Sequence, residues 1–322
     1  MSIIIDSDSV LASLDVNILV EALRTGHTGA GISTSRCMME DVPRSGEINH
    51  FIVLPAWRSE LAFGAKLVSV FPTNEQRSKG VNIHSTYLLF NGKDGSLLCL
   101  IRGENFTRYK TAADSALGAA ILSRADAQVL TLIGAGAQAE AQLRLFCAIR
   151  PSIKQVNIWN RTASKARYIA GNIVLKDVNV SYVEDLEAAV KVSDIVSCIT
   201  SSTSPILKGA WLQPGTHIDL VGSYTPEMRE SDDETMLCGR LFVDSRGLAA
   251  ISGDLSVPIS NGIITEAAII GDLYELCSKS VEGRRTNNEI TVFKNAGGGH
   301  LDLMVAEALY QAAILSKELV SF

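Results

Sequence analysis

The chain has 322 residues, a formal net charge of −6 and a hydrophobic content of 47%. This length predicts about two domains, and this composition is ordinary for a globular protein with a substantial core. Cations are not in excess, which argues against binding to nucleic acid, and no stretch reaches the ~18 apolar residues that a membrane-spanning helix needs.

The N-terminal residues and the cysteines predict the compartment. The first 23 residues, MSIIIDSDSVLASLDVNILVEAL, have neither a basic n-region nor a sustained apolar h-region, so they do not resemble a signal peptide. The cysteines stand far apart, form no CxxC pair and are predicted to be buried, reduced thiols: Cys37, Cys99, Cys147, Cys198, Cys238 and Cys277. We therefore expect a cytoplasmic protein, and we predict no metal site.

The first third of the chain predicts a short strand, a helix and then an antiparallel sheet. Residues 15–23 have the apolar spacing of a helix, which Gly26 and Gly29 would end. Residues 48–72 and 83–102 contain short runs rich in β-branched and aromatic residues, separated by turn sequences. The last two of these runs predict a hairpin.

From Thr111 onward, strands alternate with helices. An Ala-rich helix comes first, and strands are predicted in QVLTLIG, VNIWN, DIVSCIT, THIDLVGS, RLFVDS and EITVFKNAG. This alternation is typical of parallel βαβ units and therefore of an α/β fold. Residues 301–322 are expected to form a long helix that returns to the first domain. The predicted domains are 1–112 with this helix, and 113–300.

The strongest chemical signal is the turn Gly134-Ala-Gly136-Ala-Gln-Ala139. A lone match to this pattern is weak, but here a strand precedes it, a helix follows it, and a second strand completes the unit within about 30 residues. Gly134 would allow the tight turn, Gly136 would let a pyrophosphate approach the backbone, and Ala139 is small enough for helix–strand packing. The helix N-terminus would bind the diphosphate. A Gly-rich turn without a ligand is the alternative.

The end of the second strand, Trp159-Asn160-Arg161-Thr162, bears on the form of the cofactor. NAD-preferring folds usually carry a carboxylate there, and this chain has none. Asn160, Arg161 and Thr162 offer donors and a cation suited to a 2′-phosphate, so NADP(H) is predicted to be preferred over NAD(H). Alternatively, Arg161 is a solvated loop residue and Asn160 only caps the next helix. The predicted cofactor contacts are Thr111, Gly134, Ala135, Gly136, Ala137, Gln138, Asn160, Arg161, Thr162, Lys165, Thr200, Ser201, Val221, Gly222 and Ser223.

Four residues outside the nucleotide fold could bind an anionic substrate. Lys66 lies in an apolar strand, where period-2 alternation places it with the core-directed Gly64. Lys110 lies at the start of the Ala-rich helix, Arg44 follows a proline in an early loop, and His84 begins a strand. Each alone would be an ordinary surface residue. Together they could form a cationic pocket for a carboxylate, with Lys66 or His84 able to donate a proton.

These segments together resemble the ornithine cyclodeaminase/μ-crystallin family over nearly the whole chain. The matching stretches are GAKLVSVFP, FTRYKTAADSALGAAILSRADAQVLTLIGAGAQA, VNIWNRT, PGTHIDLVGSYTPEMRE, LFVDS, ISGDLSVPI and EITVFKNAGGGHLDLMVA. The resemblance implies a homodimer in which an N-terminal α+β domain binds substrate and forms the dimer, joined to a Rossmann domain. By position, Arg44, Lys66 and Lys110 match the family's cations for the substrate carboxylate. His84 matches a histidine of the substrate pocket in μ-crystallin-like members.

Two departures from the family pattern narrow the expected reaction. Lys110-Thr111 stands where the family usually has Arg-Thr, so the charge is kept but the bidentate guanidinium is lost. Tyr224 stands where ornithine cyclodeaminases carry a catalytic aspartate, and a tyrosine cannot supply a carboxylate. Cyclodeamination is therefore not expected.

The resemblance then implies an NAD(P)H-dependent reductase of cyclic α-imino acids. Δ1-Pyrroline-2-carboxylate giving L-proline is the first candidate reaction, and Δ1-piperideine-2-carboxylate giving L-pipecolate is the second. An alanine-type amino-acid dehydrogenase, an ornithine cyclodeaminase and a non-catalytic NADPH- and ligand-binding protein are the alternatives.

Overall fold

The computed structural model describes residues 3–29, 31–43, 46–74, 82–316 and 320–321. The chain divides into two compact units. The first unit comprises Met1–Lys110 and Gly298–Phe322, and the second comprises Thr111–Gly297. The two units are described separately below.

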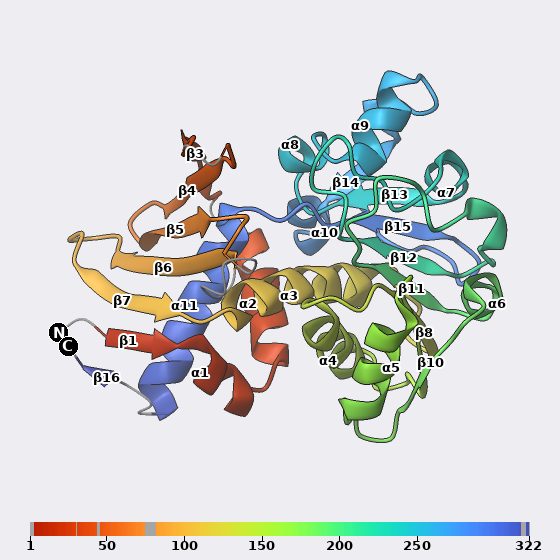
Figure 1. Cartoon of the computed structure of the whole chain (residues 1–322), viewed down its shortest axis with the longest axis horizontal. Helices are drawn as coiled ribbons and strands as arrows, with labels where there is room; N and C mark the ends of the chain where they lie inside the picture. Colours follow the sequence, from red (N-terminus) through yellow and green to blue (C-terminus); the bar gives the residue numbers. More distant parts are fainter. Residues whose placement is uncertain (1–2, 30, 44–45, 75–81, 317–319, 322) are drawn as a thin grey trace. The chain divides into compact units, whose positions relative to one another are not determined.

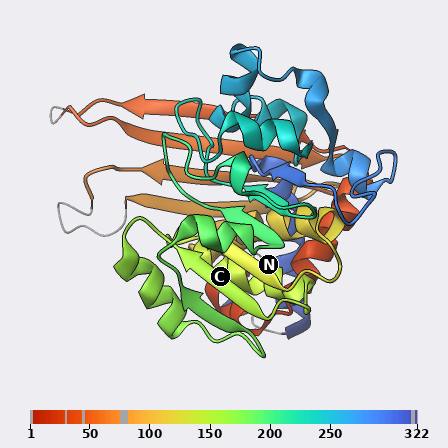
Figure 2. The same cartoon turned by 90° about the vertical axis from the view of Figure 1, so that its right-hand side faces the viewer.

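The first unit is built on one sheet with the strand order β16-β1-β7-β6-β5-β4-β2, in which β3 also pairs with β4. All of these pairs are antiparallel except β1 with β7. Figure 2 shows the long strands of this sheet side by side. The strands are β1 (Ile3–Asp6), β2 (Ser33–Thr34), β3 (Cys37–Asp41), β4 (Asn49–Arg58), β5 (Ala62–Val70), β6 (Ile83–Asn91), β7 (Leu97–Arg102) and β16 (Val320–Ser321). The predicted hairpin over residues 83–102 is confirmed as β6 and β7.

Helices cover one face of this sheet. They are α1 (Ser7–Ser13), α2 (Asn17–Thr28) and α11 (Gly299–Ser316), of which α11 lies along the sheet (Figure 1). On the covered face, side chains such as Tyr87 and Leu89 are fully buried, as are Leu23 of α2 and Val305 of α11, and all four belong to the core. The other face carries the stacked rings of Trp57, Phe63 and Phe90, with centroid distances of 4.3 and 4.9 Å, and Trp57 is 52% exposed.

The helix α3 (Asn105–Leu122) starts earlier than the sequence pattern suggests. The Ala-rich pattern begins at Thr111, but the helix begins six residues before it, at Asn105. The carboxylate of Asp8 accepts a hydrogen bond from the N–H of Asn105 at 3.2 Å, which satisfies one of the free donors of the first helical turn. Lys110 therefore lies inside the helix, one and a half turns from its start.

The second unit contains a sheet with the order β10-β9-β8-β11-β12-β15-β13-β14, in which every pair is parallel. The strands are β8 (Val129–Ile133), β9 (Gln155–Trp159), β10 (Asn179–Tyr182), β11 (Ile195–Cys198), β12 (His217–Leu220), β13 (Arg240–Val243), β14 (Ile269–Asp272) and β15 (Thr291–Lys294). The helices are α4 (Ala139–Ile149), α5 (Ala163–Asn172), α6 (Leu186–Lys191), α7 (Asp233–Cys238), α8 (Arg246–Ala249), α9 (Gly253–Ser260) and α10 (Leu273–Cys277). The order of the first five strands is that of a dinucleotide-binding fold, so the predicted α/β class with a Rossmann-type sheet is confirmed.

Buried strands explain why this unit folds as it does. Ile133, Val196, Ile218 and Val292 lie in four neighbouring strands and have no exposed surface, because helices cover parallel sheets on both faces. The prediction that every cysteine is buried is confirmed for Cys99 and Cys198, whereas Cys147 and Cys277 are half-buried and two cysteines are exposed. Cys37 is exposed because it lies on β3, all of whose residues are exposed, and Cys238 is exposed at the end of α7.

Among the described residues, no helix is long and apolar enough to span a membrane, and no group of three or more histidine, cysteine or acidic side chains is arranged to hold a metal ion. The cytoplasmic location stays a prediction.

Candidate active site

The first candidate half-site is a buried cluster of two lysines and one aspartate in the first unit. Lys66 on β5 is 7% exposed, Lys110 on α3 is 4% exposed, and Asp302 on α11 is fully buried. Lys66 Nζ lies 3.1 Å from Asp302 Oδ1 and 3.0 Å from Oδ2, and Lys110 Nζ lies 3.7 Å from Oδ1. With both lysines protonated and the aspartate ionised, the cluster keeps one net positive charge.

Local structure explains how Asp302 reaches the lysines. Gly299 begins α11 against β4, where a Cβ at Gly299 would lie 3.4 Å from the carbonyl oxygen of Pro55. Asp302 then falls in the first helical turn, where the helix dipole favours a carboxylate. Period-2 alternation along β5 turns Lys66 to the same face as Ala62 and Gly64, both of which are buried, as the sequence predicted.

Burial and charge set the protonation of this cluster. Burial lowers the pKa of Lys66, Asp302 opposes that effect, and the nearby Lys110 adds to it, so the pKa of Lys66 lies below its usual value. Burial alone would raise the pKa of Asp302, but the two lysines outweigh it, and the net shift is downward. Burial, with His27 and Lys110 close by, lowers the pKa of His300 to about 3, so this histidine is neutral at neutral pH.

The other two residues predicted for the substrate pocket do not join this cluster. His84 is exposed at the start of β6 and pairs with Ser69, whereas Lys66 pairs with Tyr87. Because the register between the strands is continuous and successive side chains alternate in direction, His84 lies on the opposite face of the sheet from Lys66. The expectation of one pocket with both residues is therefore wrong within a single chain. Arg44 lies outside the described residues.

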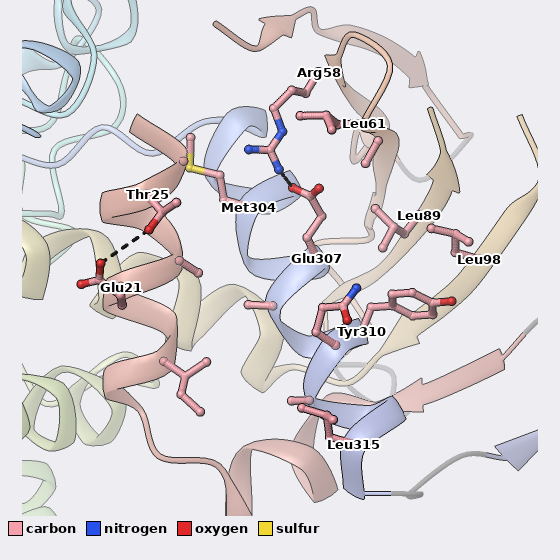
Figure 3. A pocket seen from close by; sticks show the side chains of 17 residues that line it. Glu21, Thr25, Arg58, Leu61, Leu89, Leu98, Met304, Glu307, Tyr310 and Leu315 are labelled. Carbon is pink, nitrogen blue, oxygen red and sulfur yellow. Dashed lines mark hydrogen bonds and ion pairs between the residues drawn. The ribbon is translucent and has the colours of Figure 1, made fainter. Parts of the chain in front are cut away.

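A larger cavity in the first unit contains none of the predicted site residues. It has a volume of about 620 Å³ and is bounded by α2, α11 and strand residues (Figure 3). Most of its lining is aliphatic, including Leu61, Leu89 and Met304, and the ion pair between Arg58 and Glu307 borders it. Neither lysine of the buried cluster lines it.

The second candidate half-site is a cavity of about 360 Å³ in the second unit, at the carboxyl ends of β8, β9 and β11. Its lining includes nine of the predicted cofactor contacts, namely Gly134, Ala135, Gly136, Asn160, Arg161, Thr162, Lys165, Thr200 and Ser201. It also includes five residues that the sequence reasoning missed: Trp159, Ile199, Ser202, Ser204 and Ile206. Ser202 and Ser204 could have been predicted, because they belong to a polar run directly after a predicted strand.

The two glycines of the turn have different surroundings. Gly134 has a φ of +119°, and a Cβ there would lie 2.9 Å from the carbonyl oxygen of Ile199, so only glycine fits. At Gly136 a Cβ would meet nothing within 4 Å, so this part of the backbone borders open space. Ala139 is fully buried at the start of α4, in agreement with the predicted helix–strand packing.

Asn160 connects the turn at Gly134 to the loop that follows β9. Its Oδ1 accepts the N–H of Ala135 at 3.2 Å, and its Nδ2 donates to the carbonyl of Thr162 at 2.9 Å. The N-cap of α5 is Thr162, so Asn160 is not the cap that the alternative interpretation assumed. Arg161 and Lys165 are exposed at the cavity.

Six predicted cofactor contacts do not line this cavity. Ser223 is fully buried, and its hydroxyl donates to the carbonyl of Met228 at 2.5 Å and accepts the N–H of Asp254 at 2.9 Å, so the side chain is engaged within the unit. The others are Thr111, Ala137, Gln138, Val221 and Gly222. Tyr224, after β12, is 64% exposed.

Comparison with known proteins agrees with this architecture. The family model described as "Ornithine cyclodeaminase/mu-crystallin family" matches residues 5–317. The chain is 39% identical over 288 residues to the Delta(1)-pyrroline-2-carboxylate reductase of Paracoccus denitrificans, covering 89% of each chain. It is 37% identical over 267 residues to Protein SAR DEFICIENT 4 of Arabidopsis thaliana, covering 81% of this chain and 82% of that protein.

A solved structure with the same fold over the full length is the Thermococcus litoralis Delta(1)-pyrroline-2-carboxylate reductase in complex with NADH and L-proline. It has a TM-score of 0.89 and 26% sequence identity, and the match covers 99% of this chain and 100% of that one. The resemblance that the sequence motifs indicated is thus confirmed. The chain belongs to the ornithine cyclodeaminase/mu-crystallin family.

Proposed function

We propose that this protein is an NAD(P)H-dependent reductase of cyclic α-imino acids. Δ1-Pyrroline-2-carboxylate, reduced to L-proline, is the first substrate, and Δ1-piperideine-2-carboxylate, reduced to L-pipecolate, is the second. The buried Lys66–Asp302–Lys110 cluster carries this proposal, because it places two amino groups and one carboxylate together where water is largely excluded, which leaves one net positive charge when both lysines are protonated. The relatives from Paracoccus denitrificans and Thermococcus litoralis, which are named for this reaction, support it.

The cluster provides both things that an imino acid requires from the protein. Lys110 and Arg44 would bind the substrate carboxylate and so orient the ring. Lys66 has three N–H donors. One donates to Asp302 Oδ1, and Oδ2 lies 3.0 Å from the same nitrogen, so the ammonium group keeps at least one donor for the imine nitrogen. A lowered pKa makes Lys66 a better proton donor than an ordinary lysine, and a protonated imine is the better electrophile.

The cavity of the second unit fits a nicotinamide dinucleotide. The open space at Gly136 leaves the turn accessible to a pyrophosphate, and the start of α4 provides N–H groups for it. When bound, the cofactor supplies the hydride for reduction of the C=N carbon. The chain's own residues would bind and orient it, with the loop of Asn160 at the adenosine end.

We infer a preference for NADP(H) over NAD(H) from the same loop. Arg161 and Lys165 are exposed cations on the cavity wall, and no carboxylate follows β9 to bind a ribose 2′-hydroxyl. Cations at this place suit a 2′-phosphate.

A homodimer built on the first unit is also proposed. The uncovered face of its sheet carries a row of apolar side chains that includes Trp57, Phe63, Leu67 and Phe90. Exposed apolar patches of this kind mark protein–protein contacts, and two copies of one surface associate most simply around a two-fold axis. We assign substrate binding and dimerisation to the first unit and cofactor binding to the second.

A substrate panel tests the proposed function. The oxidation of NADPH is followed with Δ1-pyrroline-2-carboxylate, Δ1-piperideine-2-carboxylate and, separately, pyruvate plus ammonia. Turnover of a cyclic imino acid, with pyruvate much slower, is the expected result. Ammonia-dependent turnover of pyruvate as the fastest reaction would replace the proposal with an alanine-type dehydrogenase. Tight NADPH binding with no turnover would indicate a binding protein.

A further inference from the structure

A buried carboxylate, Glu230, connects two backbone segments of the second unit. Its Oε1 accepts the N–H of Thr200, after β11, at 2.5 Å, and its Oε2 accepts the N–H of Gly222, after β12, at 2.6 Å. A Cβ at Gly222 would lie 1.9 Å from the carbonyl oxygen of Thr200, so the two segments are in the closest backbone contact that glycine allows. Glu230 itself has no exposed surface.

The main chain of Glu230 also holds the far end of the segment that begins at Thr200. Its carbonyl oxygen accepts the N–H groups of Ile206 and Leu207, both at 2.9 Å. Between these two attachments lies the stretch 200–206, which contributes Thr200, Ser201, Ser202, Ser204 and Ile206 to the wall of the cofactor cavity. One residue therefore fixes both ends of this wall.

Glu230 is in turn held by Asp254 at the start of α9. Asp254 Oδ1 accepts the N–H of Glu230 at 2.9 Å and that of Ser231 at 3.0 Å. Lys294 Nζ at the end of β15 lies 3.8 Å from Asp254 Oδ2, and all of these side chains are fully buried. The wall segment is thus supported by Glu230 in the loop after β12, by α9 and by the end of β15, all of which lie outside residues 200–206.

We propose that Glu230 is a positioning residue for the cofactor: its ionised carboxylate holds the segment 200–206 in the conformation that binds the nicotinamide dinucleotide. The inference rests on the cofactor site of the proposed function. It adds the residue that holds one wall of that site in place. Glu230 does not line the cavity, so it acts through Thr200 and Gly222 and not by touching the cofactor.

The protonation of Glu230 should then control cofactor affinity. An ionised carboxylate accepts from both N–H groups, whereas protonation turns one oxygen into a donor and weakens one of the two bonds. Burial raises the pKa of Glu230 to about 7, with Lys294 lowering it and Asp254 raising it. The other titratable groups around this network are Cys198 on β11, Asp219 on β12 and Asp244 after β13. Affinity should fall as the pH falls through about 7.

The test is a titration of the full-length protein with NADH, followed by the fluorescence of the bound nucleotide between about pH 6 and about pH 8. NADH is the probe because it lacks the 2′-phosphate, whose own pKa of about 6 would obscure the effect. For the wild-type protein we expect Kd to rise by about ten-fold toward the acidic end. Glu230→Gln should bind NADH about ten-fold more weakly at about pH 8, with no pH dependence in this range.

Asp244→Asn is the matched control. Asp244 is also fully buried with a pKa raised by burial to about 7, and it accepts the N–H groups of Ser245, Ala296 and Gly297, none of which lies in 200–206. Because Asp244 and Glu230 both interact with Lys294, this variant should shift the midpoint of the pH dependence of NADH binding but should not abolish that dependence. Wild-type affinity and pH dependence in Glu230→Gln would overturn the inference.

A second measurement applies if Glu230→Gln does not fold. Amide hydrogen exchange of the wild-type segment 199–207, corrected for the intrinsic rate, should show less protection below about pH 7 than above it. Protection that does not change with pH would overturn the inference. Neither NADH binding nor hydrogen exchange depends on turnover. A protein that does not reduce imino acids would refute the proposed function, and the role of Glu230 in cofactor binding could still be tested.

Discussion

Replacing Lys66 by methionine removes the cation that makes two contacts with Asp302, at 3.0 and 3.1 Å, and leaves a buried carboxylate with Lys110 at 3.7 Å. Breaking a buried ion pair on one side costs about 3–5 kcal/mol, so a clear loss of unfolding free energy is expected. The net charge of the cluster falls from plus one to zero.

The same change should affect reduction more than cofactor binding. A charge-assisted contact is worth about 1.5–3 kcal/mol, and a general acid contributes about 10²–10⁴ in rate, so kcat/KM for Δ1-pyrroline-2-carboxylate should fall by at least about 100-fold. Lys66 lies in the first unit and outside the nucleotide fold, so the Kd for NADPH should stay within about three-fold of the wild-type value. This change is smaller than the one expected from losing a single hydrogen bond to a charged group.

The double variant Lys66→Met/Asp302→Asn separates charge from chemistry. It restores the net charge of plus one and removes the uncompensated carboxylate, so most of the stability should return in chemical denaturation. Activity should remain low, because no ammonium group is left at position 66. A fully active Lys66→Met would refute the assigned role, and recovery of activity in the double variant would show that Lys66 acts only through its charge.

Three other outcomes follow from the structure. Arg161→Ala should raise the KM for NADPH about ten- to a hundred-fold and that for NADH little. Arg167→Ala is the control: Arg167 lies on α5, just after the loop of Arg161, with its side chain over the ring of Tyr182, and its loss should change neither KM. Equal effects of Arg161→Ala on both cofactors would contradict the 2′-phosphate contact. With NAD, L-ornithine should yield no ammonia, because the side chain after β12 is Tyr224; release as fast as imine reduction would count against the reductase. Light scattering at micromolar concentration should give twice the chain mass of 34.6 kDa, and Leu67→Asp on the uncovered sheet face should give a monomer.

Local sequence was enough to predict nine of the residues that line the cavity of the second unit, but it missed others, such as Trp159 and Ile199. The turn from Gly134 to Ala139 and the loop from Asn160 lie directly after apolar strands, and the parallel order of those strands brings their carboxyl ends to one edge of the sheet. Strand alternation likewise placed Lys66 on the buried face of β5, since its direction depends only on its neighbours in the strand.

The register between paired strands could not be predicted from the pattern of residues within each strand. His84 and Lys66 lie on strands that pair, but whether they share a face depends on which residues stand opposite each other. A shift of one residue would have put His84 on the face of Lys66. No feature of HSTYLLF itself determines that register.

Asp302 shows why the sequence alone could not predict every residue of the proposed substrate site. It contacts Lys66 across 236 positions of sequence, from the first turn of a helix whose apolar pattern indicates burial without indicating a partner. Substrate-binding residues for a carboxylate are sought among cations, because opposite charges attract. The sequence provides no comparable reason to choose Asp302, although its carboxylate lowers the free-energy cost of burying the two lysines. Asp302 opposes the effect of burial and of Lys110 on the pKa of Lys66, and so favours the charged form of that lysine. With both lysines protonated, one positive charge is left over, and we propose that it binds the carboxylate of an α-imino acid. The buried carboxylate is therefore as much a part of the proposed substrate site as the lysines that the sequence revealed.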